Sequence, residues 1–208
     1  MNISELLNSG SKILKLNNIK THQLDSELVL SNLLKKEREN LIINSNQKVS
    51  ESTILNFKKL ITRRANKEPL AYILENKEFW SKDFYIDRNT LIPRPETELL
   101  CESVVKIFKN NRLNILDIGT GSGCIILSIL SELKKAKGIG IDISRKAILV
   151  AKKNSRKLGL NKRVKFFNKS LEDFHGYKFD LIVSNPPYIE TSSIKNLSED
   201  VKKFEPKI

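Results

Sequence analysis

The stretch LNILDIGTGSG, residues 113–123, decides the fold. Its first half is an apolar run of the length of a buried β-strand, and it ends at Asp117. Gly119, Gly121 and Gly123 follow, directly before an apolar helical segment. Glycine allows a tight turn and a close approach to a ligand, because it has no β-carbon. The stretch therefore predicts a strand, a ligand-binding turn and a helix in direct succession.

Strands and helices alternate after this turn. A helical pattern over 122–133 leads from the first strand to the apolar segment GIGIDI (138–143), and one over 145–158 leads to VKFF (164–167), after which FDLIVS (179–184) follows. This alternation is typical of parallel strands joined by helical crossovers, with both faces of the sheet covered. We therefore expect an α/β fold with a Rossmann-like parallel sheet.

The chemistry of the turn narrows the choice of ligand. Cys124 stands where the dinucleotide fingerprint has its third glycine or alanine, and no Lys-Ser or Lys-Thr pair follows as in a phosphate loop. A second carboxylate, Asp142, ends the next strand, where an acid can accept both hydroxyls of a ribose. With Asp117, it favours a nucleoside that carries a cationic tail, S-adenosylmethionine. The alternative is that Asp142 only caps the helix that begins near Ser144.

A second motif, SNPPYIE (184–190), follows the last apolar strand. Two adjacent prolines end that strand, because they have no N–H to donate. Ligands of open parallel sheets lie beyond the carboxyl ends of the strands, so Asn185 should face the same crevice as the glycine turn. The carbonyls of Asn185 and Pro186 can accept both hydrogens of an NH₂ group, and Tyr188 can form a flat wall beside it. We predict Asn185, Pro186, Pro187 and Tyr188 as the catalytic residues; the alternative is a plain Pro-Pro turn.

The first 74 residues have a different pattern. Apolar residues recur at helical spacing between Ile3 and Leu14, between Leu24 and Leu34, and between Ile54 and Ile61. Ser50 is a suitable N-cap for the third helix. The pattern predicts a small helical bundle over residues 1–74.

An aromatic segment connects this bundle to the sheet. Residues 78–92 are rich in aromatic and β-branched side chains and are broken by the turn-prone DRN (87–89), which predicts a β-hairpin. In the following segment IPRPETELL, Pro95 and two glutamates favour the first turn of a helix. We therefore expect a helical domain over 1–74, a hairpin linker over 75–93 and a sheet domain over 94–208.

Composition places the chain among soluble globular proteins. Of its 208 residues, 39% are hydrophobic and 29% are charged. Its longest apolar stretch, Cys124–Leu130, is too short to cross a bilayer, and the amino terminus lacks the basic and apolar regions of a secretory signal. We expect a cytoplasmic protein that does not bind membranes.

Charge and cysteine content suggest no further site. The net charge is +13, but the lysines are spread over every segment, so we expect a diffuse solvated surface and no nucleic-acid substrate. Cys101 and Cys124 form no metal-binding or redox motif, and we expect both to be small buried residues.

The segments EPLAYIL, EFW, LIPRPETELL, DIGTGSG, SNPPYI and EDVKKFEP together resemble the HemK/PrmC family. These enzymes methylate the glutamine of the GGQ motif in peptide-chain release factors. The likeness spans most of the chain. NPPY alone is shared with adenine and guanine amino-methyltransferases, whereas LIPRPETE before DIGTGSG is more specific. The resemblance implies a class I S-adenosylmethionine-dependent methyltransferase that modifies the side-chain amide nitrogen (N5) of glutamine.

The resemblance also implies roles for individual residues. Residues Asn185 to Tyr188 would hold the glutamine amide, and the helical domain would recognise the release factor. Leu171 would lie near the adenine, and Asn185 between cofactor and substrate. The expected cofactor-binding set is Asp117, Gly119, Thr120, Gly121, Ser122, Gly123, Asp142, Leu171 and Asn185.

The sequence departs from the family pattern in three places. Ser170 stands where the family usually has an Asp, and Glu75 and Ser81 replace glycines common around the hairpin. Family members continue for several strands beyond the FEP segment, whereas this sequence ends at Ile208. We therefore expect a truncated form of an enzyme that is monomeric at full length. Without the C-terminal strands, FDLIVS would be an unpaired apolar edge, prone to instability or aggregation.

Two other functions stay open on the sequence. A nucleic-acid amino-methyltransferase, acting on adenine N6 or guanine N2, agrees with NPPY and with the net charge. A non-catalytic protein that binds the cofactor and a partner agrees with the apparent truncation.

Overall fold

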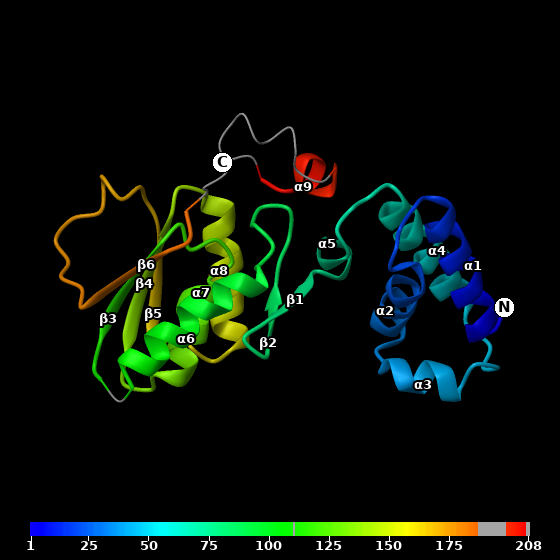
Figure 1. Cartoon of the computed structure of the whole chain (residues 1–208), viewed down its shortest axis with the longest axis horizontal. Coiled ribbons are helices and arrows are strands. Elements are labelled where there is room, and N and C mark those ends of the chain that lie inside the picture. The colour runs from blue at the N-terminus through cyan, green and yellow to red at the C-terminus, as the bar shows by residue number, and fades with distance from the viewer. Residues whose placement is uncertain (110, 187–198, 207–208) are drawn as a thin grey trace. The chain divides into compact units, whose positions relative to one another are not determined.

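The computed structural model describes residues 1–109, 111–186 and 199–206 of the chain (Figure 1). The chain divides into two compact units. One contains Met1–Leu74 together with helix 199–204, and the other contains the described residues from 75 to 186 together with 205 and 206.

The first unit is entirely helical. Its N-terminal caps follow from local chemistry: Asn2 and Glu5 form a capping box on the first helix, and the Ser50 hydroxyl accepts the N–H of Thr53 on the fourth. The three long helices and the Ser50 cap expected from the sequence are confirmed. The helices are α1 (Ile3–Leu16), α2 (His22–Leu34), α3 (Arg38–Ile43), α4 (Glu51–Ala65), α5 (Leu70–Leu74) and α9 (Glu199–Phe204).

The core of this unit is formed by the apolar faces of its helices. Gly10 lies in the middle of α1, where a β-carbon would come within 2.6 Å of the Phe57 ring, so only glycine allows α1 and α4 to pack this closely. Asp25 is buried and pairs with Arg64 at 2.6 Å, which offsets the desolvation of its charge. The buried apolar residues are Ile3, Leu6, Leu14, Ile19, Val29, Leu30, Leu41, Phe57, Ile61 and Ile73.

The second unit begins with the expected hairpin, but its turn lies elsewhere. Strands β1 (Asn76–Phe79) and β2 (Lys82–Tyr85) are antiparallel, and the connecting Trp80 and Ser81 have φ of 54° and 51°. The turn expected at residues 87–89 follows the hairpin instead, where the Asp87 carboxylate accepts the N–H of Asn89. The prediction of the turn position was wrong because turn-prone residues mark any turn, including one outside a hairpin.

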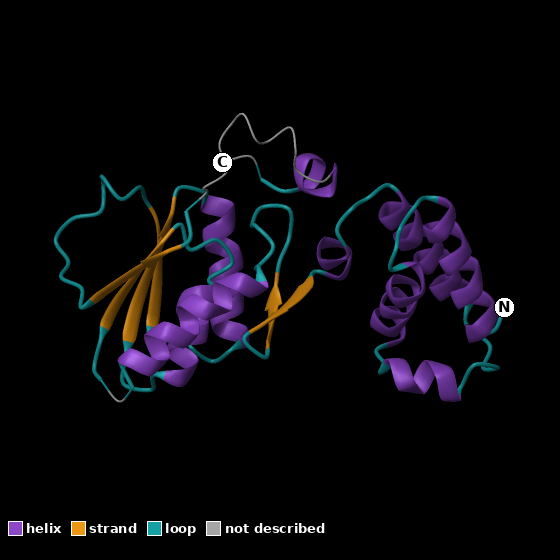
Figure 2. Ribbon diagram, viewed as in Figure 1, coloured by secondary structure: helices purple, strands orange, loops and turns teal. Residues whose placement is uncertain are grey.

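A four-stranded parallel sheet follows, in the order β5-β4-β3-β6 (Figure 2). Its alternation with helices confirms the expected α/β class. The strands are β3 (Asn114–Ile118), β4 (Lys137–Asp142), β5 (Val164–Asn168) and β6 (Leu181–Ser184). The helices are η1 (Pro95–Thr97, a 3-10 turn), α6 (Glu98–Ile107), α7 (Cys124–Glu132) and α8 (Arg145–Lys157).

Helices pack against one face of this sheet. On that face, a β-carbon on Gly138 would come within 2.5 Å of Ile126 from α7, so glycine allows the helix to lie directly on the strand. Two right-handed crossovers in the same direction, β3 to β4 and β4 to β5, place α7 and α8 on the same side.

The opposite face carries no helix in the described residues. The connection from β5 to β6 is a loop over residues 169–180, whose Phe174 and Tyr177 rings contact Phe167. Ile182 is 58% exposed on this face. The expectation that helices cover both faces is therefore wrong for the described part, because the third crossover is a loop.

The expectation of two buried cysteines holds fully for Cys101 and in part for Cys124. Cys101 is buried and Cys124 half-buried, and burial raises the pKa of both thiols to about 12, so they are inert hydrophobic groups at neutral pH. In the described ranges, no helix has the length and apolar character required to span a membrane.

Candidate functional site

The glycine turn between β3 and α7 adopts the tight backbone expected from the sequence. Gly119, Gly121 and Gly123 have φ of 68°, 55° and 79°, a region that strongly favours glycine. A β-carbon on Gly119 would meet no atom within 4 Å, so the space in front of the turn is open. At Gly123 it would lie 3.1 Å from Leu127 and 3.3 Å from Ala151, so this glycine allows α7 and α8 to pack closely.

Asp117 lies buried beneath the turn. Its Oδ2 accepts a hydrogen bond from the Thr120 hydroxyl at 2.6 Å, and its Oδ1 has no hydrogen-bond partner among the described residues. Burial raises the pKa of this carboxyl to about 7. The Thr120 hydroxyl and the nearby Ile126 backbone N–H, which falls short of a hydrogen bond, act in the opposite direction. The site therefore contains a carboxyl group that titrates near neutral pH.

Asp142 joins the end of β4 to the turn. Its Oδ2 accepts the N–H of Gly121 at 2.9 Å, and its Oδ1 accepts the N–H of Ser144 at 2.8 Å. The N-cap of α8 is Ser144, whose hydroxyl accepts the N–H of Ala147 at 3.2 Å. The cap role considered for Asp142 therefore belongs to Ser144, and Asp142 braces the glycine turn.

Asn185 lies at the same sheet edge as the turn. Ser184 pairs with Ile118 in the sheet, and its hydroxyl donates to the Ile118 carbonyl at 3.0 Å. Asn185, the next residue, is exposed, and its Nδ2 donates to the Thr97 hydroxyl at 3.2 Å. Pro186 is exposed beside it. Pro187 and Tyr188 lie outside the described residues.

The remaining predicted residues divide into two groups. Thr120 and Ser122 are buried, only 5% and 3% exposed. The Thr120 N–H donates to the Ile141 carbonyl and its own carbonyl accepts the N–H of Gly123, so these two residues support the turn from within. Leu171 is 52% exposed in the loop after β5, on the carboxyl side of the sheet. The fold thus brings together, at one edge of the sheet, Gly119 to Gly123, Asp142 and Asn185. No described contact joins Leu171 to them.

Asn154 of α8 is a residue that the sequence analysis missed. It is fully buried; its Oδ1 accepts the N–H of Tyr85 at 2.8 Å, and its Nδ2 donates to the carbonyls of Tyr85 and Ser122, both at 2.9 Å. It therefore ties the hairpin to the glycine turn. A polar residue within the apolar face of α8, between Ala151 and Leu158, was the available signal.

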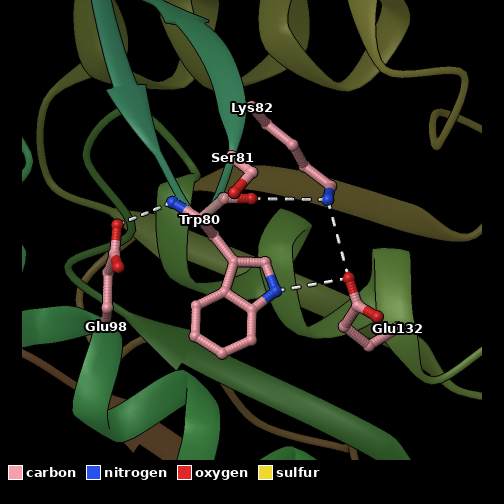
Figure 3. Close-up of a pocket in the computed structure, with 5 residues that line it drawn as sticks. All are labelled: Trp80, Ser81, Lys82, Glu98 and Glu132. Carbon is pink, nitrogen blue, oxygen red and sulfur yellow. Dashed lines mark hydrogen bonds and ion pairs between the residues drawn. The ribbon is translucent and has the colours of Figure 1, made fainter.

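The hairpin tip forms a separate pocket of about 350 Å³ (Figure 3). The Trp80 backbone N–H donates to Glu98 at 2.7 Å, and its indole N–H donates to Glu132 at 3.2 Å. Burial alone would raise the pKa of Glu132, but the hydrogen bonds from Trp80 and Ser131 and the charge of Lys82 lower it. None of the predicted site residues lines this pocket, so we interpret it as the anchor of the hairpin on α6 and α7.

Over residues 1–109, 111–186 and 199–206, no group of three or more His, Cys, Asp or Glu residues could hold a metal ion.

A parallel sheet with an open glycine turn and two carboxylates at its carboxyl edge has the arrangement of a site for a nucleoside-containing ligand. Residues 109–208 match the family described as a methyltransferase domain, and residues 5–74 match the PrmC N-terminal domain. The release factor glutamine methyltransferase of Clostridium acetobutylicum is 40% identical over 99% of this chain and 74% of its own length. The chain belongs to the release factor glutamine methyltransferase family, so the expected family and fold class are confirmed.

Two further proteins are similar to this chain over part of their length. The release factor glutamine methyltransferase of Buchnera aphidicola subsp. Baizongia pistaciae is 42% identical over 88% of this chain and 66% of its own length. A crystal structure of a ribosomal protein L11 methylase from Lactobacillus delbrueckii subsp. bulgaricus is 27% identical, with a TM-score of 0.42 over 49% of this chain and 51% of that one. The chain thus spans about three quarters of the first relative and about two thirds of the second.

S-adenosylmethionine, the cofactor implied by this class, fits the residues present. Asp117 offers a buried acceptor oxygen without a partner in the described part, which suits a cationic or N–H donor group. The open space at Gly119 leaves room for a ligand against the backbone. Asp142 retains acceptor capacity, because each carboxylate oxygen can accept more than the one hydrogen bond that it makes.

Proposed function

We propose that this chain transfers a methyl group from S-adenosylmethionine to the side-chain amide nitrogen of a glutamine in a peptide-chain release factor. The observation that carries the proposal is the position of Asn185 beside the glycine turn. Asn185 directly follows Ser184, which pairs with Ile118 at the end of β3. The 40% identity to a release factor glutamine methyltransferase supports the same substrate.

The cofactor would be held by the turn and the two strand ends. S-adenosylmethionine supplies an electrophilic methyl group on a positively charged sulfur. Gly119 to Gly123 would contact it through the backbone, Asp142 would accept from its ribose hydroxyls, and Leu171 would lie near its adenine. Asp117, once ionised, would favour its positive charge.

The acceptor would be held by Asn185 and Pro186. An amide nitrogen is a poor nucleophile, because its lone pair is delocalised. The Asn185 Oδ1 and the Pro186 carbonyl would accept its two N–H groups, and these hydrogen bonds strengthen as the nitrogen becomes tetrahedral and positive. Such strengthening lowers the barrier more than it stabilises the bound substrate. Pro187 and Tyr188 stay predicted members of this site.

The other parts of the chain would serve recognition. The helical unit over residues 1–74 would bind the release factor, and the hairpin over 75–93 would connect it to the methyltransferase domain over 94–208. We infer a cytoplasmic enzyme, since release factors act there, and one that is monomeric at full length.

Mass spectrometry of the GGQ peptide after incubation with S-adenosylmethionine tests the proposal. The wild type should methylate the glutamine, and Asn185→Ala should reduce transfer by about 100-fold or more while cofactor affinity falls less. Asn161→Ala, on an exposed turn far along the chain from the motif, is the matched control and should keep full activity. Methylation of DNA or RNA in place of the release factor, or cofactor binding without any transfer, would overturn the proposal.

A further inference from the structure

One short turn of the second unit binds two distant points of the chain. Residues 94–97, which we call the RPET turn, precede α6. Thr97 accepts the Asn185 side-chain N–H at 3.2 Å, across 88 positions of sequence. Arg94 pairs with Glu205 at 2.6 Å, across 111 positions. Asn185 is the first residue of the predicted acceptor segment, and Glu205 follows that segment in the sequence.

The RPET turn is a rigid anchor. Arg94 stands between Pro93 and Pro95, and its extended backbone, with φ of −97° and ψ of 139°, is the conformation that a following proline enforces. The Arg94 carbonyl accepts the N–H of Thr97 at 3.0 Å, which closes the turn. Pro93 is buried, so the turn is fixed to the core of its unit.

The Thr97 contact decides which end of the Asn185 amide is available. An amide has an acceptor oxygen and a donor nitrogen, and only the oxygen can hold the N–H of a substrate amide. Asn185 is exposed, so its side chain would otherwise rotate and present either end. Because its Nδ2 donates to Thr97, its Oδ1 is directed away from Thr97 and is left for a substrate.

The Arg94 contact involves Glu205, which follows the segment in the sequence. The Glu205 side chain is only 3% exposed, whereas that of Arg94 is 43% exposed. A carboxylate taken out of water is stabilised by a charged partner, so the Arg94 guanidinium helps to hold Glu205 in its position. The ion pair thereby ties Glu205 to the RPET turn.

We propose that Arg94 and Thr97 are positioning residues for methyl transfer: Thr97 orients the Asn185 amide, and Arg94 holds Glu205 against the same turn. This inference rests on the proposed function. Neither residue needs to contact the reacting atoms, and both act through the geometry of the acceptor.

Variants of Thr97 test the first contact. Thr97→Val keeps the shape but removes the hydroxyl, so kcat for release factor methylation should fall by about 10- to 100-fold. The KM for the release factor and the Kd for S-adenosylhomocysteine should change less than about threefold, because ground-state binding is left intact. Thr97→Ser should restore most of the activity, and Glu96→Gln, in the same turn, should leave it unchanged. Wild-type kcat in Thr97→Val, or an equal loss in kcat and cofactor affinity, would overturn the assignment.

Variants of Arg94 and Glu205 test the second contact. Arg94→Gln and Glu205→Gln should each lower kcat by about tenfold, and the double variant should lose less than the product of the two single losses, because both variants remove the shared ion pair. Multiplicative losses would show that the two residues act separately, against the proposal.

A measurement without substrate separates this inference from the proposed function. Hydrogen exchange of the Asn185 side-chain amide, assigned by NMR from the resonances lost in Asn185→Asp, should be about fivefold faster in Thr97→Val than in wild type, as for the loss of one net hydrogen bond. Equal rates would refute the Thr97 contact, even in an active enzyme. If the wild type does not methylate the release factor but the rates differ, the proposed function fails and the contact stands.

Discussion

At the scale of single residues, Asp117 carries the least expected property of the site. Its position at the end of β3 follows from the sequence, but its titration does not. Complete burial raises the pKa of its carboxyl from an ordinary value of 3.8 to about 7, and the nearby Asp142 acts in the same direction. A group that is half-ionised near neutral pH makes both folding and ligand binding sensitive to pH in the physiological range.

This property predicts a pH dependence of stability. Above about pH 4, the unfolded chain has released the proton of Asp117, whereas the folded state keeps it up to about pH 7. The contribution of this group to the free energy of unfolding should therefore fall as the pH rises from about 4 to about 7. The slope is at most about 1.4 kcal/mol per pH unit. Urea denaturation at pH 5, 6, 7 and 8 measures it.

Asp117→Asn is the control for this prediction, because it keeps the shape and removes the charge. The variant should be more stable than the wild type at pH 8, and the difference should shrink toward pH 5. A difference that stays constant over this range would show that Asp117 is not the titrating group.

At the scale of elements, the hairpin turn holds residues with a β-carbon in an unfavourable backbone conformation. Trp80 and Ser81 both have positive φ, as a two-residue hairpin turn requires, and Glu75 at the start of the hairpin has φ of 53°. Side chains with a β-carbon are strained in this region. Glu75 and Ser81 replace glycines that are common in the family. At both positions, the backbone conformation would favour glycine.

Ser81→Gly should therefore stabilise the protein by about 0.5–1 kcal/mol. Glycine relieves the strain of the left-handed backbone, and this gain exceeds the loss from the greater conformational entropy of the unfolded chain. Urea denaturation gives the free energy of unfolding. Ser103→Gly, within the regular helix α6, is the matched control and should destabilise by about 0.5 kcal/mol. Equal destabilisation by both variants would contradict the prediction.

At the scale of the whole molecule, the two units differ in how completely their cores are enclosed. The helical unit encloses an apolar core between its helices, with Gly10 and Phe57 in close contact. The described sheet is packed against helices on one face, while the other face exposes Ile182. Neighbouring residues of one strand thus have very different surroundings.

Strand β6 provides a test of this difference. Val183 is 3% exposed on the helix-covered face, so Val183→Ala should destabilise by roughly 1–3 kcal/mol through lost packing. Ile182→Ala, one position away on the opposite face, should change the free energy of unfolding by less than about 0.5 kcal/mol. If both variants are destabilised alike in urea, then the second face is covered in solution.

The sequence by itself determined the order of the elements, the glycine turn and the position of Asn185 beyond β6, because strand and helix periods, prolines and glycines act on neighbouring residues. Only the tertiary structure decided which distant groups meet. Thr97 with Asn185, Arg94 with Glu205 and Asn154 with Tyr85 are 88, 111 and 69 positions apart. No local pattern records such pairs, since each depends on how whole elements pack and on which polar groups that packing buries together.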